Sequence, residues 1–181
     1  MNPLHNHEHV VLLDDAGRSI GTALKAEVHH HSTPLHLAFS CYVFDDADRV
    51  LLTRRALDKR AFPGVWTNSF CGHPGPAEAM EDAVVRRAQQ ELGLEISDLR
   101  CVLPDFRYQA VDASGVVENE VCPVFCCRAA SALDADPAEI VESAWVPWHQ
   151  LRAAAQLPWA ISPWAAEQVP LLDAAGVGRH G

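Results

Sequence analysis

Short runs of β-forming residues, separated by Asp- and Gly-rich turns, fill the first third of the chain. Residues 9–13 and 20–24 flank the sequence Asp-Asp-Ala-Gly and predict a hairpin of two strands. Residues 35–44 and 50–54 are rich in β-formers, and the Asp-rich turn at 45–48 between them predicts a second hairpin. The N-terminal part of the chain is therefore expected to be mainly β.

One segment has the pattern of a helix. It follows the Gly- and Pro-rich stretch 72–76 and covers residues 77–92. Acidic residues come early in this segment, two arginines come later, and Gly93 stands just past its end. Acidic residues near the start of a helix and glycine after its last turn are both favourable, so this is the clearest helix in the sequence.

The second half of the chain mixes strands with helices. Strands are predicted at 105–111 and 116–127, joined by a turn at 112–115. A short strand is predicted at 144–148 and a helix at 149–155. Because there is no regular βαβ alternation, we predict an α+β fold in which a mixed sheet is flanked by helices.

The composition is that of one globular domain. The chain has 181 residues, of which 49% are hydrophobic and 21% charged, and no linker is visible. We expect one domain over residues 10–175, with flexible tails at 1–9 and 176–181. No apolar run approaches the roughly 20 residues of a membrane span, and the first residues lack the pattern of a signal peptide. A cytoplasmic location is the resulting expectation.

The net charge restricts the partners. At −10, the protein is not expected to bind nucleic acid or anionic membranes. An anionic substrate would need a locally basic pocket or a metal ion. No heptad pattern or surface patch is visible in the sequence, so the expected state is a monomer or a weak homodimer.

The cysteines fall into two groups. Without an export signal we expect all six to be reduced. Five lie in strand-like apolar surroundings and are expected to pack as small hydrophobes: Cys41, Cys101, Cys122, Cys126 and Cys127. Cys71, next to Gly72 and near His73, is different. It has no CxxC partner for redox chemistry, so a catalytic acid or nucleophile is favoured over a redox thiol or a buried hydrophobe.

Carboxylates and imidazoles supply candidate metal ligands. Glu118 and Glu120 are two residues apart in an apolar strand, so both side chains should project from one face. They form either a solvated polar edge or an anionic site that needs a cation. The histidines are the run 29–31, His36 and His73, and with the two glutamates they would suit Zn²⁺, Mn²⁺ or Fe²⁺. The spacing does not decide whether they converge.

The predicted helix carries a family pattern. From Gly72 the chain runs through five residues to Glu78, through seven more to Arg86, and on to Glu91, Leu92 and Gly93. This spacing resembles the Nudix box, Gly-x5-Glu-x7-Arg-Glu-hydrophobic-x-Glu-Glu-x-Gly-hydrophobic. Arg87 and Gln90 stand where Nudix hydrolases have glutamate, and only Glu91 keeps its carboxylate. All three residues share one helical face, so a hydrolytic metal cluster is not expected there.

A set of further motifs resembles type 1 isopentenyl diphosphate isomerase, a branch of the Nudix superfamily. In chain order they are LHLAFS, TRRAL, FPGVWTNSFCGHP, EDAVVRRAQQELG, PDFRYQA, ENEVCPVF and PWAISPW. The resemblance extends from about Val10 to Trp164. It implies a single Nudix-like domain that interconverts isopentenyl and dimethylallyl diphosphate in isoprenoid biosynthesis. The reaction adds a proton to one carbon and removes a proton from another, through a tertiary carbocation.

The resemblance also implies roles for individual residues. Cys71 and Glu120 match the family's acid/base pair, Tyr108 the tyrosine that assists protonation and Trp164 an active-site tryptophan that faces the cation. A tightly bound divalent metal would be held by three histidines and two glutamates: His29, His36, His73, Glu118 and Glu120. The choice of His29 over His30 or His31 depends only on the family's spacing to His36. Mg²⁺ on the diphosphate would be held by Glu91 and the Cys71 carbonyl, and the phosphate contacts would be Lys25, Arg55, Lys59 and Arg87.

Two other functions compete with isomerisation. One is a Nudix hydrolase of nucleotide or other diphosphates, which the missing glutamates disfavour. The other is a non-catalytic metal- or thiol-binding protein, which would retain bound metal after Cys71→Ser and Glu120→Gln yet turn over nothing.

Overall fold

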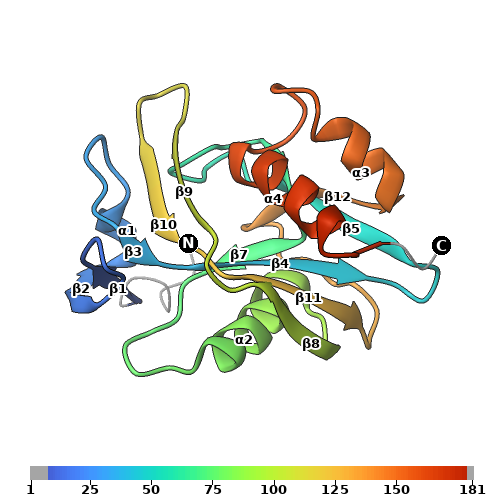
Figure 1. The fold of residues 1–181 in the computed structure, drawn as a ribbon, viewed down its shortest axis with the longest axis horizontal. Coiled ribbons are helices and arrows are strands. Elements are labelled where there is room, and N and C mark those ends of the chain that lie inside the picture. The colour runs from blue at the N-terminus through green and yellow to red at the C-terminus, as the bar shows by residue number, and fades with distance from the viewer. Residues whose placement is uncertain (1–7, 179–181) are drawn as a thin grey trace.

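Strands dominate the architecture, and they form two sheets in the part of the chain that the computed structural model describes, residues 8–178 (Figure 1). The first sheet has the order β2-β1-β3-β10-β9 and is built from β1 (His9–Leu13), β2 (Ser19–Leu24), β3 (His36–Leu37), β9 (Arg107–Val111) and β10 (Val117–Val121). The second has the order β12-β5-β4-β11-β8 and is built from β4 (Phe39–Phe44), β5 (Arg49–Arg55), β8 (Ile96–Leu103), β11 (Val124–Ala129) and β12 (Ile140–Pro147). Two short strands, β6 (Trp66–Thr67) and β7 (Phe70–Gly72), pair with β5 and β4.

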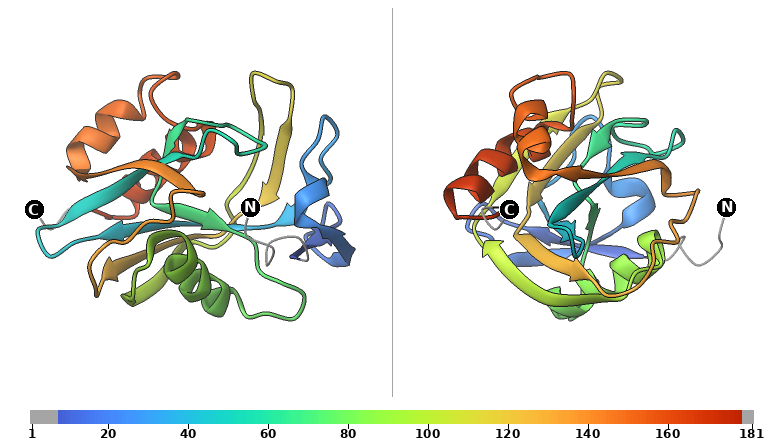
Figure 2. Two further views of the ribbon diagram at one scale, coloured as in Figure 1. Left: turned by 180° about the vertical axis from the view of Figure 1, so that it is seen from behind. Right: turned by 90° about the vertical axis from the view of Figure 1, so that its right-hand side faces the viewer.

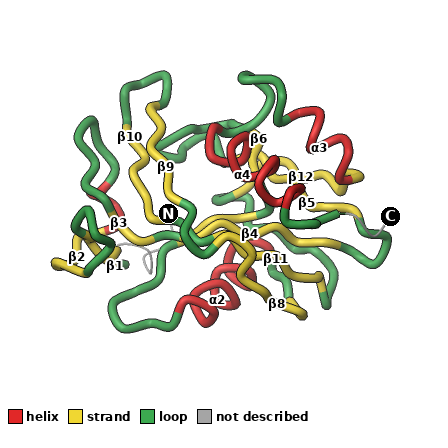
Figure 3. The backbone as a smooth tube through the Cα atoms, in the orientation of Figure 1, coloured by secondary structure: helices red, strands yellow, loops and turns green. Residues whose placement is uncertain are grey.

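Helices cover both faces of the larger sheet, with α2 (Met80–Leu92) on one face and α3 (Trp148–Ala154) and α4 (Pro163–Ala174) on the other (Figures 2 and 3). The short helix α1 (Lys25–Val28) lies beside β1 and β2 of the smaller sheet. All six residues of the central strand β4 are buried, and their side chains alternate between two cores. Phe39, Cys41 and Val43 pack with α2, whereas Tyr42 and Phe44 pack with α3 and α4. The predicted α+β class is confirmed.

Two of the predicted strands are interrupted at the same level. The stretch 35–44 leaves one sheet and enters the other at Ala38, and the stretch 116–127 does so at Cys122 and Pro123. Proline has no backbone N–H, which removes a donor from the ladder at that point. The parallel pairing continues across the break, because the Ala38 N–H donates to Val121 at 2.9 Å and the Ser40 N–H donates to Pro123 at 3.1 Å. Each prediction of one continuous strand was therefore wrong.

The predicted helix at 77–92 ends where expected but begins later. It starts at Met80, since Ala77 has a left-handed backbone (φ 62°) that cannot belong to a right-handed helix. Its end at Leu92 is confirmed by Gly93, whose φ of 60° places its N–H against the carbonyls of Ala88 and Gln89.

For three elements of the second half, the sequence pattern predicted no element or one that is too short. β8 was not predicted, because its residues are mostly half-exposed and carry no clear alternation. β12 starts at Ile140, earlier than the predicted strand at 144–148. Helix α4 was missed because it is apolar on nearly all sides and contains Pro170. Its start was nevertheless encoded, since Ser162 caps the helix by accepting a hydrogen bond from the Ala165 N–H.

The cysteines are free thiols, and four of the five expected to pack in the interior do so: Cys41, Cys122, Cys126 and Cys127. The prediction was wrong for Cys101, which is exposed on β8. At the chain ends, His9 begins β1 and Val177 is buried, while residues 1–7 and 179–181 of the predicted tails lie outside the described range. No helix among the described residues is long and apolar enough to span a membrane.

Candidate active site

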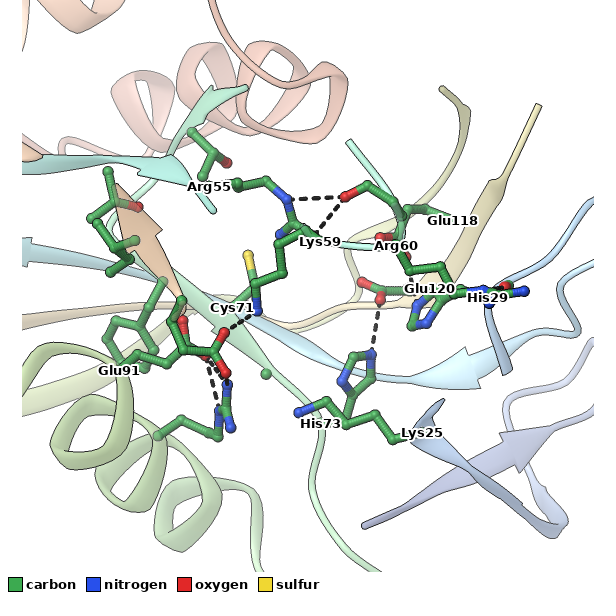
Figure 4. Close-up of a pocket in the computed structure, with 18 of the residues that line it drawn as sticks. Lys25, His29, Arg55, Lys59, Arg60, Cys71, His73, Glu91, Glu118 and Glu120 are labelled. Carbon is green, nitrogen blue, oxygen red and sulfur yellow. Dashed lines mark hydrogen bonds and ion pairs between the residues drawn. The ribbon is translucent and has the colours of Figure 1, made fainter. Parts of the chain in front are cut away.

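A cavity of about 580 Å³ opens between the two sheets and gathers nearly all the residues that the sequence singled out (Figure 4). The predicted residues that line it are Lys25, His29, Arg55, Lys59, Cys71, His73, Arg87, Glu91, Tyr108, Glu118, Glu120 and Trp164. The remaining one, His36, is fully buried at the base of the histidine cluster. The cavity therefore brings a thiol, carboxylates, imidazoles and cations together from distant parts of the chain.

Three imidazoles and one carboxylate converge at one end of the cavity. His36 on β3 pairs directly with Glu120 on the parallel strand β10, His73 follows β7, and His29 caps the C-terminus of α1. One potential ligand atom from each of these four residues lies within 4.8 Å of the others. Glu118 is outside that group, but its Oε2 is 2.9 Å from His29 Nε2. Its carboxylate adds an anionic edge to the cluster.

The polar atoms of this cluster are poorly satisfied without an ion. His36 Nδ1 lies 2.9 Å from the Pro34 carbonyl, which leaves the other ring nitrogen, Nε2, facing the cluster. That Nε2 is 3.3 Å from His73 Nε2. His73 Nδ1 is buried without a hydrogen-bond partner, and the buried atoms His29 Nε2 and Glu118 Oε2 face only each other, at 2.9 Å. Imidazole nitrogens and carboxylate oxygens oriented in this way fit a divalent transition metal.

Burial and charge set the protonation of the cluster. Burial lowers the pKa of His73 to about 3, although the nearby Glu120 carboxylate opposes this. His73 is therefore neutral at physiological pH, which is the form that binds a metal. Burial alone would raise the pKa of Glu120, but hydrogen bonds from His36 and His73 outweigh it and hold that pKa well below its usual range. Glu120 is therefore an ionised carboxylate.

The histidine run divides into three different environments. His29 faces the cluster, His30 Nδ1 accepts from the Ser32 N–H at 3.1 Å, and His31 Nδ1 is 2.8 Å from the Gly115 carbonyl. The spacing to His36 had selected His29, and the structure places that side chain in the group. Arg60, which the sequence did not single out, lines the cavity and donates from Nε to the His29 carbonyl. No local pattern signals this contact with the backbone.

The Cys71 thiol lies in the part of the cavity next to the histidine cluster and Glu120. In the view of Figure 4, Cys71 stands between Glu91 on one side and His73 with Glu120 on the other. Burial raises the pKa of the Cys71 thiol to about 11, so the sulfur carries a proton at neutral pH. Tyr108 donates from its hydroxyl to Glu120 Oε2 at 2.9 Å. The cavity thus offers one protonated group and one ionised carboxylate with a tyrosine at its side.

Cations line the other end of the cavity, and carboxylates balance several of them. Lys25 Nζ is 2.7 Å from Glu8 Oε2, and Lys59 pairs with Glu139. Burial lowers the pKa of Lys59 to about 8. Arg55 places its guanidinium 5.6 Å from the centre of the Trp164 ring. These cations suit a polyanionic ligand. Glu139 lies in a poorly patterned stretch of the sequence that gives no sign of its position in the cavity.

The Nudix-like helix presents a charge pair where a hydrolase would present glutamates. Arg87 donates from Nε to Glu91 Oε1 at 2.9 Å, and both side chains are almost fully buried. Gln90 Oε1 accepts from both Arg86 and Arg87. Gly72 permits the close approach of β7, because a Cβ there would lie 2.8 Å from Arg87 Cγ. Glu91 is consequently the one carboxylate of the three box positions on this face.

Comparison with known proteins gives a consistent result. The NUDIX domain family model matches residues 34–172. The chain is 71% identical over 173 residues to an isopentenyl-diphosphate Delta-isomerase of Mycolicibacterium vanbaalenii, covering 96% of both proteins. It is 61% identical to a protein of the same name from Clavibacter michiganensis subsp. michiganensis, over 94% of this chain and 88% of the relative. Among solved structures, DR0079 from Deinococcus radiodurans superposes with a TM-score of 0.70 at 19% identity, over 90% of this chain and 98% of that one. The last likeness concerns the fold alone.

Proposed function

The chain belongs to the isopentenyl-diphosphate Delta-isomerase family of NUDIX-domain proteins, and from this membership we propose how its cavity interconverts isopentenyl and dimethylallyl diphosphate. The observation that carries the proposal is the placement of a protonated thiol and an ionised carboxylate in one cavity whose other end is cationic. A hydrocarbon tail with a diphosphate head matches that division of the cavity.

Cys71 and Glu120 are the proposed acid/base pair. Moving the double bond requires a proton to be added to the terminal carbon of the alkene and another to be removed from the carbon on the far side of the developing cation. One of the two groups gives a proton and the other takes one, and the assignment reverses with the direction of reaction. Tyr108 donates a hydrogen bond to Glu120 and is placed to stabilise its carboxylate and to assist proton delivery there.

Trp164 is proposed to face the developing tertiary cation. Its side chain lines the cavity and is only 1% exposed, with Phe62 packed against it at a ring distance of 5.2 Å. The face of an indole attracts positive charge, and an apolar wall keeps out the water that would trap a carbocation as an alcohol.

The histidine cluster is the proposed site of a tightly bound divalent metal. The residues that would hold it are His29, His36, His73, Glu118 and Glu120. The partnerless His73 Nδ1 and the facing atoms His29 Nε2 and Glu118 Oε2, all buried, support that set. A bound Mn²⁺, Zn²⁺ or Fe²⁺ would supply positive charge that offsets the two buried carboxylates. It would also keep Glu120 oriented toward the cavity.

The cationic end is the proposed diphosphate site. Lys25, Arg55, Lys59 and Arg87 would contact phosphate oxygens, and Glu91 with the Cys71 carbonyl would hold a substrate-linked Mg²⁺. This arrangement explains how a protein of charge −10 can bind a polyanion, because its cations are concentrated in one pocket. It also gives Arg87 a reason to stand where hydrolases have a carboxylate.

A deuterium experiment tests the proposed function. The purified protein is incubated with isopentenyl diphosphate, Mg²⁺ and a divalent transition metal in deuterated water, and products are followed by mass spectrometry. Dimethylallyl diphosphate that carries deuterium is the expected product. Release of phosphate or pyrophosphate without isomerisation would instead identify a hydrolase, and a folded, metal-loaded sample that produces neither would overturn the assignment.

Three broader expectations belong to the same proposal. A single isomerase domain over residues 10–175 agrees with the range of the NUDIX match at 34–172. Cytoplasmic location and a monomer or weak homodimer are proposed with it, and size-exclusion chromatography with light scattering would test the oligomeric state.

A further inference from the structure

Asn68 occupies an unusual position beside the reacting groups. It lies in the two-residue connection between β6 and β7, is 0% exposed and has none of the roles described so far. Its single side-chain oxygen, Oδ1, accepts three hydrogen bonds, from Thr67 Oγ1 at 2.8 Å, Cys71 Sγ at 3.3 Å and Trp164 Nε1 at 3.0 Å. One atom therefore contacts both the thiol and the indole.

The orientation of this amide is determined by its surroundings. Its Nδ2 donates to the backbone carbonyls of Cys41 at 3.0 Å and Phe70 at 2.7 Å, which can only accept. On the opposite side, the indole N–H of Trp164 can only donate. A flipped amide would place its one oxygen against the two carbonyls and its NH2 group against the indole N–H, so the oxygen must face Cys71.

A second chain of hydrogen bonds reaches the thiol from the other side. Tyr42 donates from its hydroxyl to Gln168 Oε1 at 2.8 Å, and Gln168 Nε2 donates to Ser40 Oγ at 3.0 Å. Ser40 Oγ, which accepts from Gln168, can give its own proton to a sulfur, with Cys71 Sγ at 3.5 Å and Cys122 Sγ at 3.4 Å. Because the Cys71 thiol donates its own proton to Asn68, its sulfur is free to accept from Ser40.

We propose that Asn68 and Ser40 are positioning residues that hold the Cys71 thiol in one rotamer between them, and that Asn68 ties this rotamer to the ring of Trp164. The inference depends on the proposed isomerase function, because it assigns the purpose of this network to the proton transfer at Cys71. A short side chain such as cysteine has few contacts of its own to fix its sulfur. Two opposed hydrogen bonds supply that constraint without adding bulk to the cavity.

The kinetic consequence is specific. The diphosphate contacts lie at the cationic end, so loss of Asn68 should leave substrate binding nearly intact while the sulfur and the indole shift. A displacement of about 1 Å in a reacting group can reduce turnover by about a hundredfold. We expect Asn68→Ala to lower kcat by about 10- to 100-fold, with KM changed by less than about threefold.

Ser69→Ala is the matched control. Ser69 is the next residue, is also 0% exposed and makes two buried hydrogen bonds, from its hydroxyl to the Leu51 carbonyl at 2.7 Å and from the Val43 N–H at 2.7 Å. These bonds join strands and contact no proposed catalytic group. Ser69→Ala should lower the melting temperature in a similar way yet keep kcat within about threefold of the parent protein.

The thiol itself provides a second readout that does not need turnover. The alkylation rate of Cys71 by iodoacetamide is measured by peptide mass spectrometry, with the exposed Cys101 as an internal standard. Asn68→Ala should change the ratio of the two rates by more than about threefold, and Ser69→Ala should leave it unchanged. If Asn68→Ala does not fold, Ser40→Ala provides the same two measurements from the opposite side of the sulfur.

The outcomes separate this inference from the proposed function. Isomerisation by the parent protein together with an unchanged kcat and alkylation ratio in Asn68→Ala and Ser40→Ala would overturn the inference alone. An equal loss of kcat in Ser69→Ala would also overturn it, because the effect would then be structural. If the parent protein isomerises nothing but Asn68→Ala still alters the alkylation ratio, the contact between Asn68 and Cys71 is real but has no role in isomerisation. The inference would then fall together with the proposed function.

Discussion

The pair Arg87–Glu91 allows a direct test of the charge arrangement on the Nudix-like helix. Arg87 is 2% exposed and Glu91 is 7% exposed, and the guanidinium contacts the carboxylate from both Nε and Nη2. Glu139 Oε1 lies 3.7 Å from the same Nη2. Replacement of Arg87 by methionine keeps the volume roughly constant but leaves the buried Glu91 carboxylate without its ion-pair partner, whereas Glu139 keeps Lys59.

The expected loss of stability follows from burial. Removal of one partner from a buried ion pair costs about 3–5 kcal/mol, a large part of the 5–15 kcal/mol by which typical domains are stable. For a chain of this size, 1 kcal/mol corresponds to about 2–4 °C in Tm, so Arg87→Met should melt about 6–20 °C lower. The double variant Arg87→Met with Glu91→Gln should recover most of this loss, because it removes both charges together.

Calorimetry or circular dichroism in the absence of substrate measures the Tm of the single and the double variant. Arg49→Met is the control, since Arg49 makes a similarly short contact with Asp45, at 2.6 Å, but its side chain is 50% exposed. That surface pair should contribute no more than about 1 kcal/mol. A decrease in Tm of less than about 3 °C for Arg87→Met would refute the reasoning. So would a double variant whose decrease in Tm equals the sum of the decreases in Arg87→Met and Glu91→Gln.

Three further predictions concern catalysis and metal binding. Cys71→Ser and Glu120→Gln should each lower kcat for isomerisation by about 10²–10⁴-fold, with elemental analysis showing that Cys71→Ser keeps its metal; activity near the parent level would exclude these groups as acid and base. His36→Ala should bind less than about half the metal of the parent protein, and chelation of the parent should lower its Tm by about 8–16 °C, which corresponds to loss of a ligand present at about a thousand times its Kd. Because burial lowers the pKa of Lys59 to about 8, this side chain loses its charge as the pH rises through 8, and kcat/KM should fall there by about tenfold. Lys59→Arg should keep its charge and move the fall to higher pH, and an identical profile would show that Lys59 does not contact the diphosphate.

The sequence predicted best the elements that depend on local chemistry. The strand expected at residues 9–13 matches β1, and the end of α2 is set by Gly93, because turn and cap residues act within a few positions. Helix α4 could not be recognised by amphipathicity, since its exposed side also carries apolar residues such as Pro170 and Leu171. The breaks at Ala38 and Pro123 depend on how two distant segments pair, which no window of the sequence contains.

The site shows the same division. Spacing alone supplied candidate ligands but no reason for His29 and Glu118 to meet, and the family resemblance selected the set that the structure gathers in one cavity. Their roles there stay predictions. Arg60, Glu139 and Asn68 were not found, because they act through backbone carbonyls, counter-charges and a buried amide that have no sequence signature.

The parallel pairing that continues from the first sheet into the second limits where this protein can gain or lose residues. His36 pairs with Glu120 before the break and Ser40 pairs with Val124 after it, so both strands advance by the same number of residues while they change sheets. Side chains alternate between faces along a strand, and one residue inserted into or deleted from either segment would turn a cluster ligand away from its partner. We therefore expect insertions and deletions among functional variants to be confined to connections such as 112–116 and 155–162, while residues 36–44 and 120–128 keep a constant length. A library of single-residue insertions, selected for growth that depends on this enzyme, would show which segments tolerate a change in length.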